Sequence, residues 1–289
     1  MTTSAIALVL LSALLHALWN TIAKRATGGA VFIWMFSLVE FVLLLPAAVF
    51  LLIQGEVTLN STVLVATIGS GCLHTAYFLL LSKGYQVGDL SVVYPLARAI
   101  GPFIATFAAI LLFSERPTVQ AFIGGMLICG GVFYLTGDPR KLRNHDALPG
   151  IIFAGLTGLA IAGYTIWDAR SVSDVLIPPL FYLWAISSIR ALIFTPYIIT
   201  LANVLPEIRA IWTKDKYRAL VVGVFSPASY LLILVALTFS PVSYVAPLRV
   251  VSTLIGVMIG VRFLGEGDAR RRLGAASVMV LGVFMLALG

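Results

Sequence analysis

Charged residues are scarce in this 289-residue chain, where Asp, Glu, Lys and Arg together make up only 11% of the positions. A soluble domain has about 25% charged residues, so the composition excludes a soluble globular protein. There are only two cysteines and three histidines. Cys72 and Cys129 both lie within apolar runs, which predicts small core side chains and no disulfide framework. We expect no metal site built from histidines and no cofactor.

Apolar residues take the place of the missing charges, at 60% of the chain and a mean hydropathy of +1.04. They form ten runs of about 18 to 25 residues, the length that crosses the hydrocarbon core of a bilayer. Only helices and closed barrels satisfy their backbone in lipid, and the runs lack the alternation of a barrel strand. The sequence therefore predicts an all-α membrane protein with ten transmembrane helices, near residues 4–23, 30–53, 62–82, 90–113, 118–136, 148–168, 178–201, 219–239, 241–264 and 271–288.

The net charge of +7 is distributed over the short loops, so we expect a lipid bilayer and no nucleic acid as partner. Basic residues in loops mark the cytoplasmic side. The even-numbered loops hold only Arg116 and Arg170. This bias predicts a bacterial-type inner (plasma) membrane protein with the odd loops in the cytoplasm and both termini on the other side. The basic residues of the odd loops are Lys24, Arg25, Lys83, Arg140, Lys141, Arg143, Arg209, Lys214, Lys216, Arg218, Arg262, Arg270, Arg271 and Arg272.

The second half of the chain repeats rare residues of the first half at equal spacing. Tyr94-Pro95-Leu96-Ala97-Arg98 matches Ala246-Pro247-Leu248-Arg249, which is one residue shorter, and a glutamate, Glu115 or Glu266, follows each arginine by 17 residues. Five spans per half is an odd number, so the second copy must enter the membrane inverted. We predict repeats at 1–137 and 148–289, joined by a cytoplasmic linker at 138–147. Further matching pairs are Trp34 and Trp184, Ser37 and Ser187, Glu40 and Arg190, Pro46 and Pro196, and Tyr77 and Tyr230.

The first span, with His16-Ala17-Leu18-Trp19-Asn20 followed by Lys24, resembles the opening helix of EamA-type members of the drug/metabolite transporter superfamily. The segments from Pro95 to Glu115 and from Pro247 to Glu266 resemble the fourth and ninth helices of the same family. The resemblance implies a ten-helix transporter similar to bacterial exporters of amino acids and related metabolites. The superfamily also carries sugars, nucleotide sugars and drugs.

Four charged residues fall deep within predicted spans, where a charge costs about 3 kcal/mol or more and marks a functional candidate. Glu40 lies about 10 residues into its span, roughly 15 Å deep, and Arg190 occupies the matching place in the other half. These two residues either form an ion pair that joins the halves or take part in a binding site. We take Glu40 to be the only deep carboxylate available for proton coupling.

Arg98 and Arg249 each follow a proline by two or three residues. Proline permits a bend in the helix, and such an arginine either lines a cavity or extends back to the interface. If Glu40 neutralises one arginine, two positive charges remain at depth. A substrate carboxylate suits the planar fork of arginine donors, which favours an amino acid or a carboxylate metabolite over a cationic drug.

Polar and aromatic residues on the central spans complete the predicted substrate site. Tyrosine and tryptophan donors need partners when buried, and their faces can hold an ammonium group. Trp167 lies at a predicted helix end and fits an interface belt better. His74 is interpreted as a hydrogen-bond partner between helices, with a proton relay as the alternative. The predicted substrate-binding residues are Trp19, Asn20, Glu40, His74, Tyr77, Tyr94, Arg98, Tyr164, Arg190, Tyr230 and Arg249.

Proline and glycine positions predict where helices bend or pack closely. Pro95, Gly101, Pro102 and Pro247 are candidate hinges. The glycine-rich fifth and tenth spans carry almost no polar residues, so we expect them to form scaffold or oligomer contacts.

The function that fits these features is a secondary transporter that exports amino acids or related metabolites by alternating access between the repeats. An exporter of drug-like compounds or sugars is the alternative. No Gly-rich nucleotide-binding loop is present. An intramembrane enzyme would need a paired catalytic set at depth, and a channel would need rings of like residues, so we expect neither.

The loop charges give a direct test of orientation. A reporter that is active only in the cytoplasm should stay inactive at either terminus, because both termini are predicted to face outward. The same reporter inserted in the 138–147 linker should be active and serves as the control. A bright terminal fusion would overturn the predicted orientation.

Overall fold

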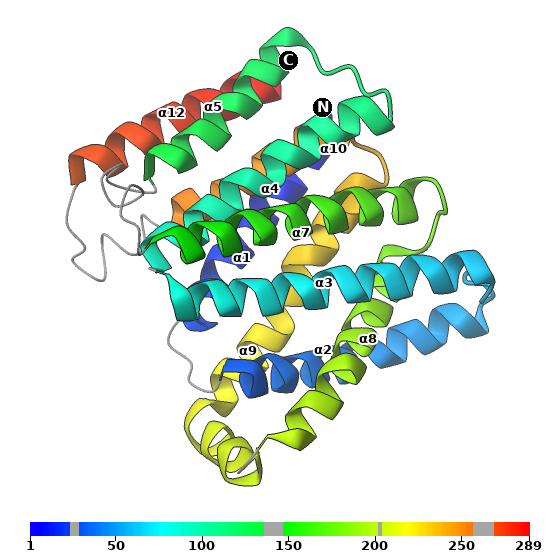
Figure 1. The fold of residues 1–289 in the computed structure, drawn as a ribbon. Coiled ribbons are helices and arrows are strands. Elements are labelled where there is room, and N and C mark those ends of the chain that lie inside the picture. Colours follow the sequence, from blue (N-terminus) through cyan, green and yellow to red (C-terminus); the bar gives the residue numbers. More distant parts are fainter. Residues whose placement is uncertain (24–28, 89, 136–146, 202–203, 257–268) are drawn as a thin grey trace.

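The computed structural model describes residues 1–23, 29–88, 90–135, 147–201, 204–256 and 269–289. These residues are helical apart from short connections, and no strand occurs among them. Residues 251–256 continue the helical path beyond α10 after a turn at Val250. The helices are α1 (Thr3–Ala23), α2 (Gly29–Ile53), α3 (Ser61–Val87), α4 (Leu90–Leu112), α5 (Val119–Leu135), α7 (Leu148–Ser173), α8 (Pro179–Thr200), α9 (Val204–Leu237), α10 (Val242–Arg249) and α12 (Ala269–Leu288) (Figure 1).

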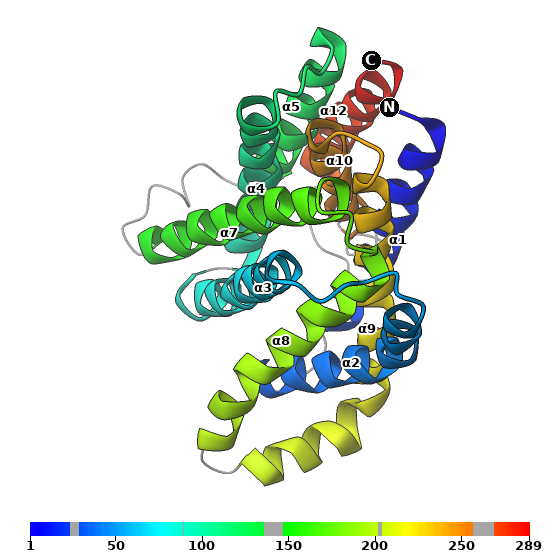
Figure 2. The same ribbon diagram turned by 90° about the vertical axis from the view of Figure 1, so that its right-hand side faces the viewer.

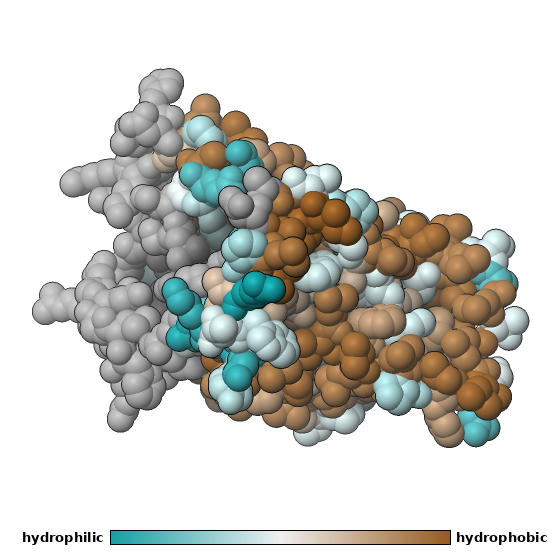
Figure 3. Space-filling model, turned by 90° about the horizontal axis from the view of Figure 1, so that it is seen from below, coloured by the Kyte–Doolittle hydropathy of each residue, from teal (hydrophilic) through white to brown (hydrophobic). Residues whose placement is uncertain are grey.

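Seven of the helices in the described part of the chain are long and apolar enough to cross a membrane. Three further apolar helices are shorter there, at Val119–Tyr134, Val242–Gly256 and Gly274–Leu288. Figure 3 shows an apolar band with polar side chains gathered mainly toward its two ends. The chain is therefore an all-helical, multi-pass membrane protein.

Three helix boundaries differ from the prediction by five residues or more. α3 continues to Val87 rather than ending near residue 82. α7 continues to Ser173 rather than ending near residue 168, so Asp168 lies inside the helix. α9 begins at Val204 instead of near residue 219, and its first part runs at an angle to the rest (Figure 2). The predicted basic loop from residue 204 onward is helical because Glu207 lies in the first turn and Asp215 pairs with Arg218 one turn later.

The helices form one bundle in which distant parts of the sequence pack together (Figures 1 and 2). α7 packs against both α3 and α4, α1 against α9, α2 against α8, and α5 against α12. α10 packs against α4 and α1. Helices α1, α3, α8 and α10 begin at the end of the bundle where both termini lie, and we name this the terminal end (Figure 1).

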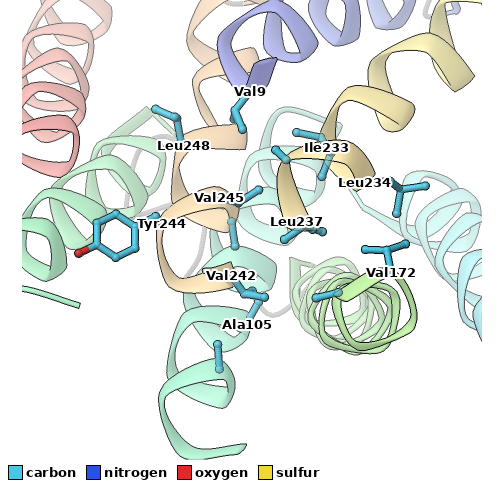
Figure 4. Close-up of a cluster of buried hydrophobic side chains, with 14 of the residues drawn as sticks. Val9, Ala105, Val172, Ile233, Leu234, Leu237, Val242, Tyr244, Val245 and Leu248 are labelled. Carbon is cyan, nitrogen blue, oxygen red and sulfur yellow. The ribbon is translucent and has the colours of Figure 1, made fainter. Parts of the chain in front are cut away.

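Apolar side chains fill both ends of the described bundle. At the terminal end, Val9 of α1, Val172 of α7, Leu237 of α9 and Val245 of α10 belong to one cluster that surrounds α10 (Figure 4). At the opposite end, a second cluster joins α1, α2, α8 and α9 and includes Phe36. These two clusters bracket the polar centre of the protein.

Some sequence predictions lie outside the described residues. They are the linker up to residue 146, the loop residues Lys24, Arg25 and Arg262, and the repeat residue Glu266.

The glycine-rich α5 and α12 pack directly on each other. A Cβ on Gly124 would lie 2.5 Å from the Leu286 backbone nitrogen and 2.6 Å from the Gly282 carbonyl oxygen. A Cβ on Gly130 would meet nothing within 4 Å. The close contact of these helices therefore depends on Gly124 and Gly282.

We predict opposite effects for two identical substitutions on α5. Gly124→Ala should lower the free energy of unfolding by about 1–3 kcal/mol, because backbone blocks the added methyl group. Gly130→Ala should leave it unchanged or raise it by up to about 1 kcal/mol, the helix-propensity gain. Thermal unfolding of both purified variants in detergent measures the difference. Equal stability of the two variants would contradict the close contact.

Candidate functional site

A small cavity lies at the centre of the bundle, where α4, α7 and α10 meet. Arg98 and Arg249 both line it, together with Thr165. Its volume of about 10 Å³ is room for about one water molecule. The two arginines therefore face the protein interior, and the cavity is closed around them.

Arg98 is only 6% exposed. Its Nη2 donates to Ser252 Oγ over 2.9 Å, while its Nε has no hydrogen-bond partner in the described structure. Ser252 in turn donates to the carbonyl of Arg249 over 2.8 Å, which links the two arginine segments. Arg98 thus keeps unused donor capacity at the cavity.

Arg249 is the last residue of α10 and is partly buried. Its Cζ lies 5.9 Å from the ring centroid of Tyr164 and 5.3 Å from that of Tyr230. Its Nη1 reaches Thr165 Oγ1 over 3.4 Å. The guanidinium therefore rests on aromatic faces, and no carboxylate of the described residues lies within ion-pair distance of it.

Four predicted residues come together as an aromatic wall beside Arg249. His74 stacks on Tyr164 with a centroid distance of 4.1 Å and meets the edge of Tyr230 at 5.1 Å. Tyr164 also contacts Tyr77 at 5.8 Å. The wall joins α3, α7 and α9 next to the cavity.

Asp168 is the functional residue that the sequence reasoning missed. It is 0% exposed, and its carboxylate accepts hydrogen bonds from Ser70, Tyr182 and Tyr230. His74 Nε2 lies 2.9 Å from its Oδ2. Glu40 is therefore not the only deep carboxylate, and the prediction that it was is wrong.

The predicted span ended near residue 168, and Asp168 was not considered among the deep charged residues. A signal for a deeper position was present: Trp167-Asp168 in the sixth span has the same order as Trp19-Asn20 in the first. The assignment of Trp167 to an interface belt stays a prediction, since this side chain is 39% exposed near the end of α7. Its indole N–H donates to the Ala66 carbonyl of α3 over 2.8 Å, six residues before the end of α7.

Glu40 and Arg190 form a buried ion pair between α2 and α8. Ser187 donates to Glu40 over 2.9 Å, and Arg190 Nε donates to Ser37 over 2.8 Å. Each charged residue is thus held by the serine three positions before its partner. The rings of Phe36 and Phe78 cover the Arg190 guanidinium at 5.5 and 5.3 Å. This fully bonded pair serves the packing of α2 on α8.

The remaining predicted site residues lie apart from the cavity. Trp19 belongs to the apolar cluster opposite the terminal end, and no hydrogen-bond partner for Asn20 Nδ2 is present in the described ranges. Tyr94 is half-buried on α4, one turn before Arg98.

Of the predicted hinges, Pro102 lines the cavity and Pro247 packs against Gly125. Gly101 lies where α4 crosses α7, since a Cβ there would come 2.5 Å from Ile161. Pro95 lies inside the continuous helix α4. The described residues contain no group of three His, Cys, Asp or Glu that could hold a metal ion.

A multi-pass helical bundle with charged side chains around a central cavity belongs to the class of membrane transport proteins. Residues 3–137 match the EamA-like transporter family. The chain is also 25% identical over 227 residues to "Uncharacterized transporter YwfM" of Bacillus subtilis (strain 168), a match that covers 78% of this chain and 72% of that protein. The resemblance seen in the sequence is confirmed for the first half of the chain, which matches the EamA-like transporter family, and the chain as a whole is similar to a membrane transporter.

A solved structure, described only as the crystal structure of a protein, has the same fold. It matches with a TM-score of 0.77 at 15% identity, over 100% of this chain and 99% of that one. Members of the EamA family are transporters rather than enzymes.

The ion pair predicts a specific pattern of stability. Arg190→Leu should cost about 3–5 kcal/mol, because it leaves Glu40 buried without its partner. The double variant Glu40→Leu with Arg190→Leu should recover most of that loss, since no unpaired charge remains. Melting temperatures in detergent measure both. A double variant as unstable as the sum of the single variants would show that the pair does not act as a unit.

Proposed function

We propose that this transporter moves amino acids and related carboxylate metabolites through a central site between two inverted repeats, in the outward direction that the family resemblance implies. The observation that carries the proposal is the convergence of Arg98 and Arg249 on one cavity. Buried arginines without a carboxylate partner attract an anion, and their planar donors fit a carboxylate.

The balance of buried charge supports an anionic group on the substrate. Glu40 and Arg190 neutralise each other. Asp215, also buried, pairs with Arg218. Around the cavity and its aromatic wall, Arg98 and Arg249 then outnumber the one carboxylate of the described residues there, Asp168. A substrate carboxylate would bring the centre of the bundle close to neutrality, which lowers the cost of burying these charges.

Helix packing supports the two inverted repeats. An exchange of the halves pairs α1 with α7, α2 with α8, α3 with α9, α4 with α10 and α5 with α12. Under this exchange the contact of α3 with α7 becomes that of α9 with α1, and the contact of α4 with α7 becomes that of α10 with α1. The contact of α2 with α8 maps onto itself, as does the contact of α5 with α12.

The closed cavity fits one stage of alternating access. About 10 Å³ is too small for an amino acid, and apolar clusters fill the described bundle on either side of it. Transport then requires the packing on one side to open while the other side stays closed. We propose that Pro95, Gly101, Pro102 and Pro247 permit this movement.

The position of the termini supports the proposed orientation. Both lie at the same end of the bundle (Figure 1), as an even number of crossings requires. The bias of basic residues toward the odd loops supports the proposal that this end lies outside the cytoplasm, in a bacterial-type inner membrane.

Substitution of the cavity arginines tests the substrate class. In proteoliposomes, Arg98→Gln and Arg249→Gln should each reduce counterflow of a radiolabelled amino-acid mixture about ten- to a hundredfold. A hydrogen bond to a charged group contributes about 1.5–3 kcal/mol, which sets this range. Counterflow of neutral sugars, if present, should be spared.

Arg116→Gln provides the matched control, because Arg116 is exposed in the loop between α4 and α5. It should transport like the unaltered protein. Equal loss of neutral and carboxylate substrates in the cavity variants would indicate that the arginines only hold the structure together. Transport of sugars or drug-like compounds alone, unaffected by these substitutions, would favour the alternative function.

A further inference from the structure

A second pocket lies at the terminal end, between α3 and α7. It is open, has a volume of about 380 Å³, and is lined in part by Ala66, Trp167 and Ser171. These three residues lie within one turn of Asp168 or contact its partner Tyr182. The pocket therefore approaches the buried carboxylate from the terminal end of the bundle.

Tyr182 connects this pocket to Asp168. Its hydroxyl lies 2.8 Å from Asp168 Oδ1, 3.1 Å from Ser171 Oγ and 3.3 Å from the Ala66 carbonyl oxygen. Ser171 and Ala66 line the pocket themselves. A single hydroxyl thus separates the carboxylate from the pocket lining.

Tyr230 connects Asp168 to the central arginines. Its hydroxyl donates to Asp168 Oδ2, and its ring lies 5.3 Å below the Arg249 Cζ. His74, which bonds the same oxygen, stacks on Tyr164, the other ring under Arg249. Tyr230 therefore lies between Asp168 and Arg249 and contacts both.

The surroundings of Asp168 leave its charge without a permanent cation. In the described part of the chain its ion-pair partner is His74 alone, whose own charge depends on a proton. No Lys or Arg of these residues lies within ion-pair distance. The titratable groups around it are His74 of α3, Tyr164 of α7, Tyr182 of α8 and Tyr230 of α9. Arg249 of α10 and Arg98 of α4 lie behind the rings, and Arg170 of α7 lines the pocket, with its Nε 3.8 Å from Asp174 Oδ2.

We propose that Asp168, together with His74, is the proton-binding site of this transporter and exchanges its proton with water through the pocket at the terminal end. This inference rests on the proposed function only for the identity of the substrate that is transported with the proton. A proton from water adds to a carboxylate oxygen of Asp168, which becomes a neutral carboxyl group, and the same proton later returns to water. No bond other than O–H forms or breaks.

The matching position in the first half strengthens the assignment. Asn20 follows Trp19 as Asp168 follows Trp167, and an amide cannot take up a proton in this range. Asp168 lies five residues before the end of α7, about 8 Å from that end. The proton site is therefore single and lies off-centre, toward the terminal end.

The position next to Arg249 sets the sign of the coupling. Protonation removes a negative charge near the arginines, so they attract a carboxylate more strongly. By linkage, a bound carboxylate raises the proton affinity of Asp168 by the same factor. Substrate and proton then cross together, and an outward flow starts only when the substrate gradient exceeds the opposing proton gradient.

The first experiment needs no substrate. Infrared difference spectra of the protein in liposomes, recorded on acidification, should show a carboxyl band that Asp168→Asn lacks. Glu115→Gln should keep the band, since the Glu115 carboxylate accepts from the backbone nitrogens of Val242 and Ser243 outside this cluster. A band that persists unchanged in Asp168→Asn would overturn the proposal. Asp168→Glu keeps a carboxylate and should keep a carboxyl band, which shows that loss of the band in Asp168→Asn does not come from misfolding.

The second experiment tests the coupling by counterflow of a radiolabelled amino-acid mixture at several pH values. Counterflow should rise as the pH falls in the unaltered protein. In Asp168→Asn it should be independent of pH and equal to the unaltered protein at the acid limit, because asparagine mimics the neutral carboxyl group. A variant that keeps the normal pH dependence would refute the coupling. Absence of counterflow in the unaltered protein would refute the proposed substrate class, and the infrared band would still decide the proton site.

Discussion

The structure depends on the cost of placing charge inside an apolar bundle. Every charged residue at depth in the described spans is held by partners suited to its position. Glu40 and Arg190 neutralise each other, and two serines use their remaining bonding capacity. Asp168 is neutralised by no fixed cation and instead accepts from three hydroxyl groups. The cost of burying charge therefore acts differently on the two sites: the Glu40–Arg190 pair is neutral as a whole, whereas the charge of Asp168 has no fixed partner.

The Glu40–Arg190 pair and Asp168 differ in whether the other half of the chain has a matching residue. The reciprocal bonds of Glu40 with Ser187 and of Arg190 with Ser37 are what two copies of one helix would make across a twofold axis. Such a contact holds equally well whichever half moves. The aspartate has no acidic counterpart at Asn20, so its chemistry distinguishes one side of the molecule from the other.

The sequence allowed the helices to be predicted well because the length of an apolar run is set by the bilayer. The bounds of α2 and α8 agree with the prediction to within a residue or two. The start of α9 could not be predicted from hydropathy, because Lys214 and Lys216 can remain helical where water solvates them. Asp168 was missed for the opposite reason: its burial depends on Ser70, Tyr182 and Tyr230, which come from three other helices. Side-chain pairs at equal spacing, such as Glu40 with Arg190, could be foreseen.

The connection between α8 and α9 is short. α8 ends at Thr200 and α9 begins at Val204. Four peptide links at about 3.8 Å each reach no farther than about 15 Å. The end of α8 and the start of α9 therefore stay within this distance of each other. An opening of the bundle opposite the terminal end must move these two helix ends together and separate them from other helices.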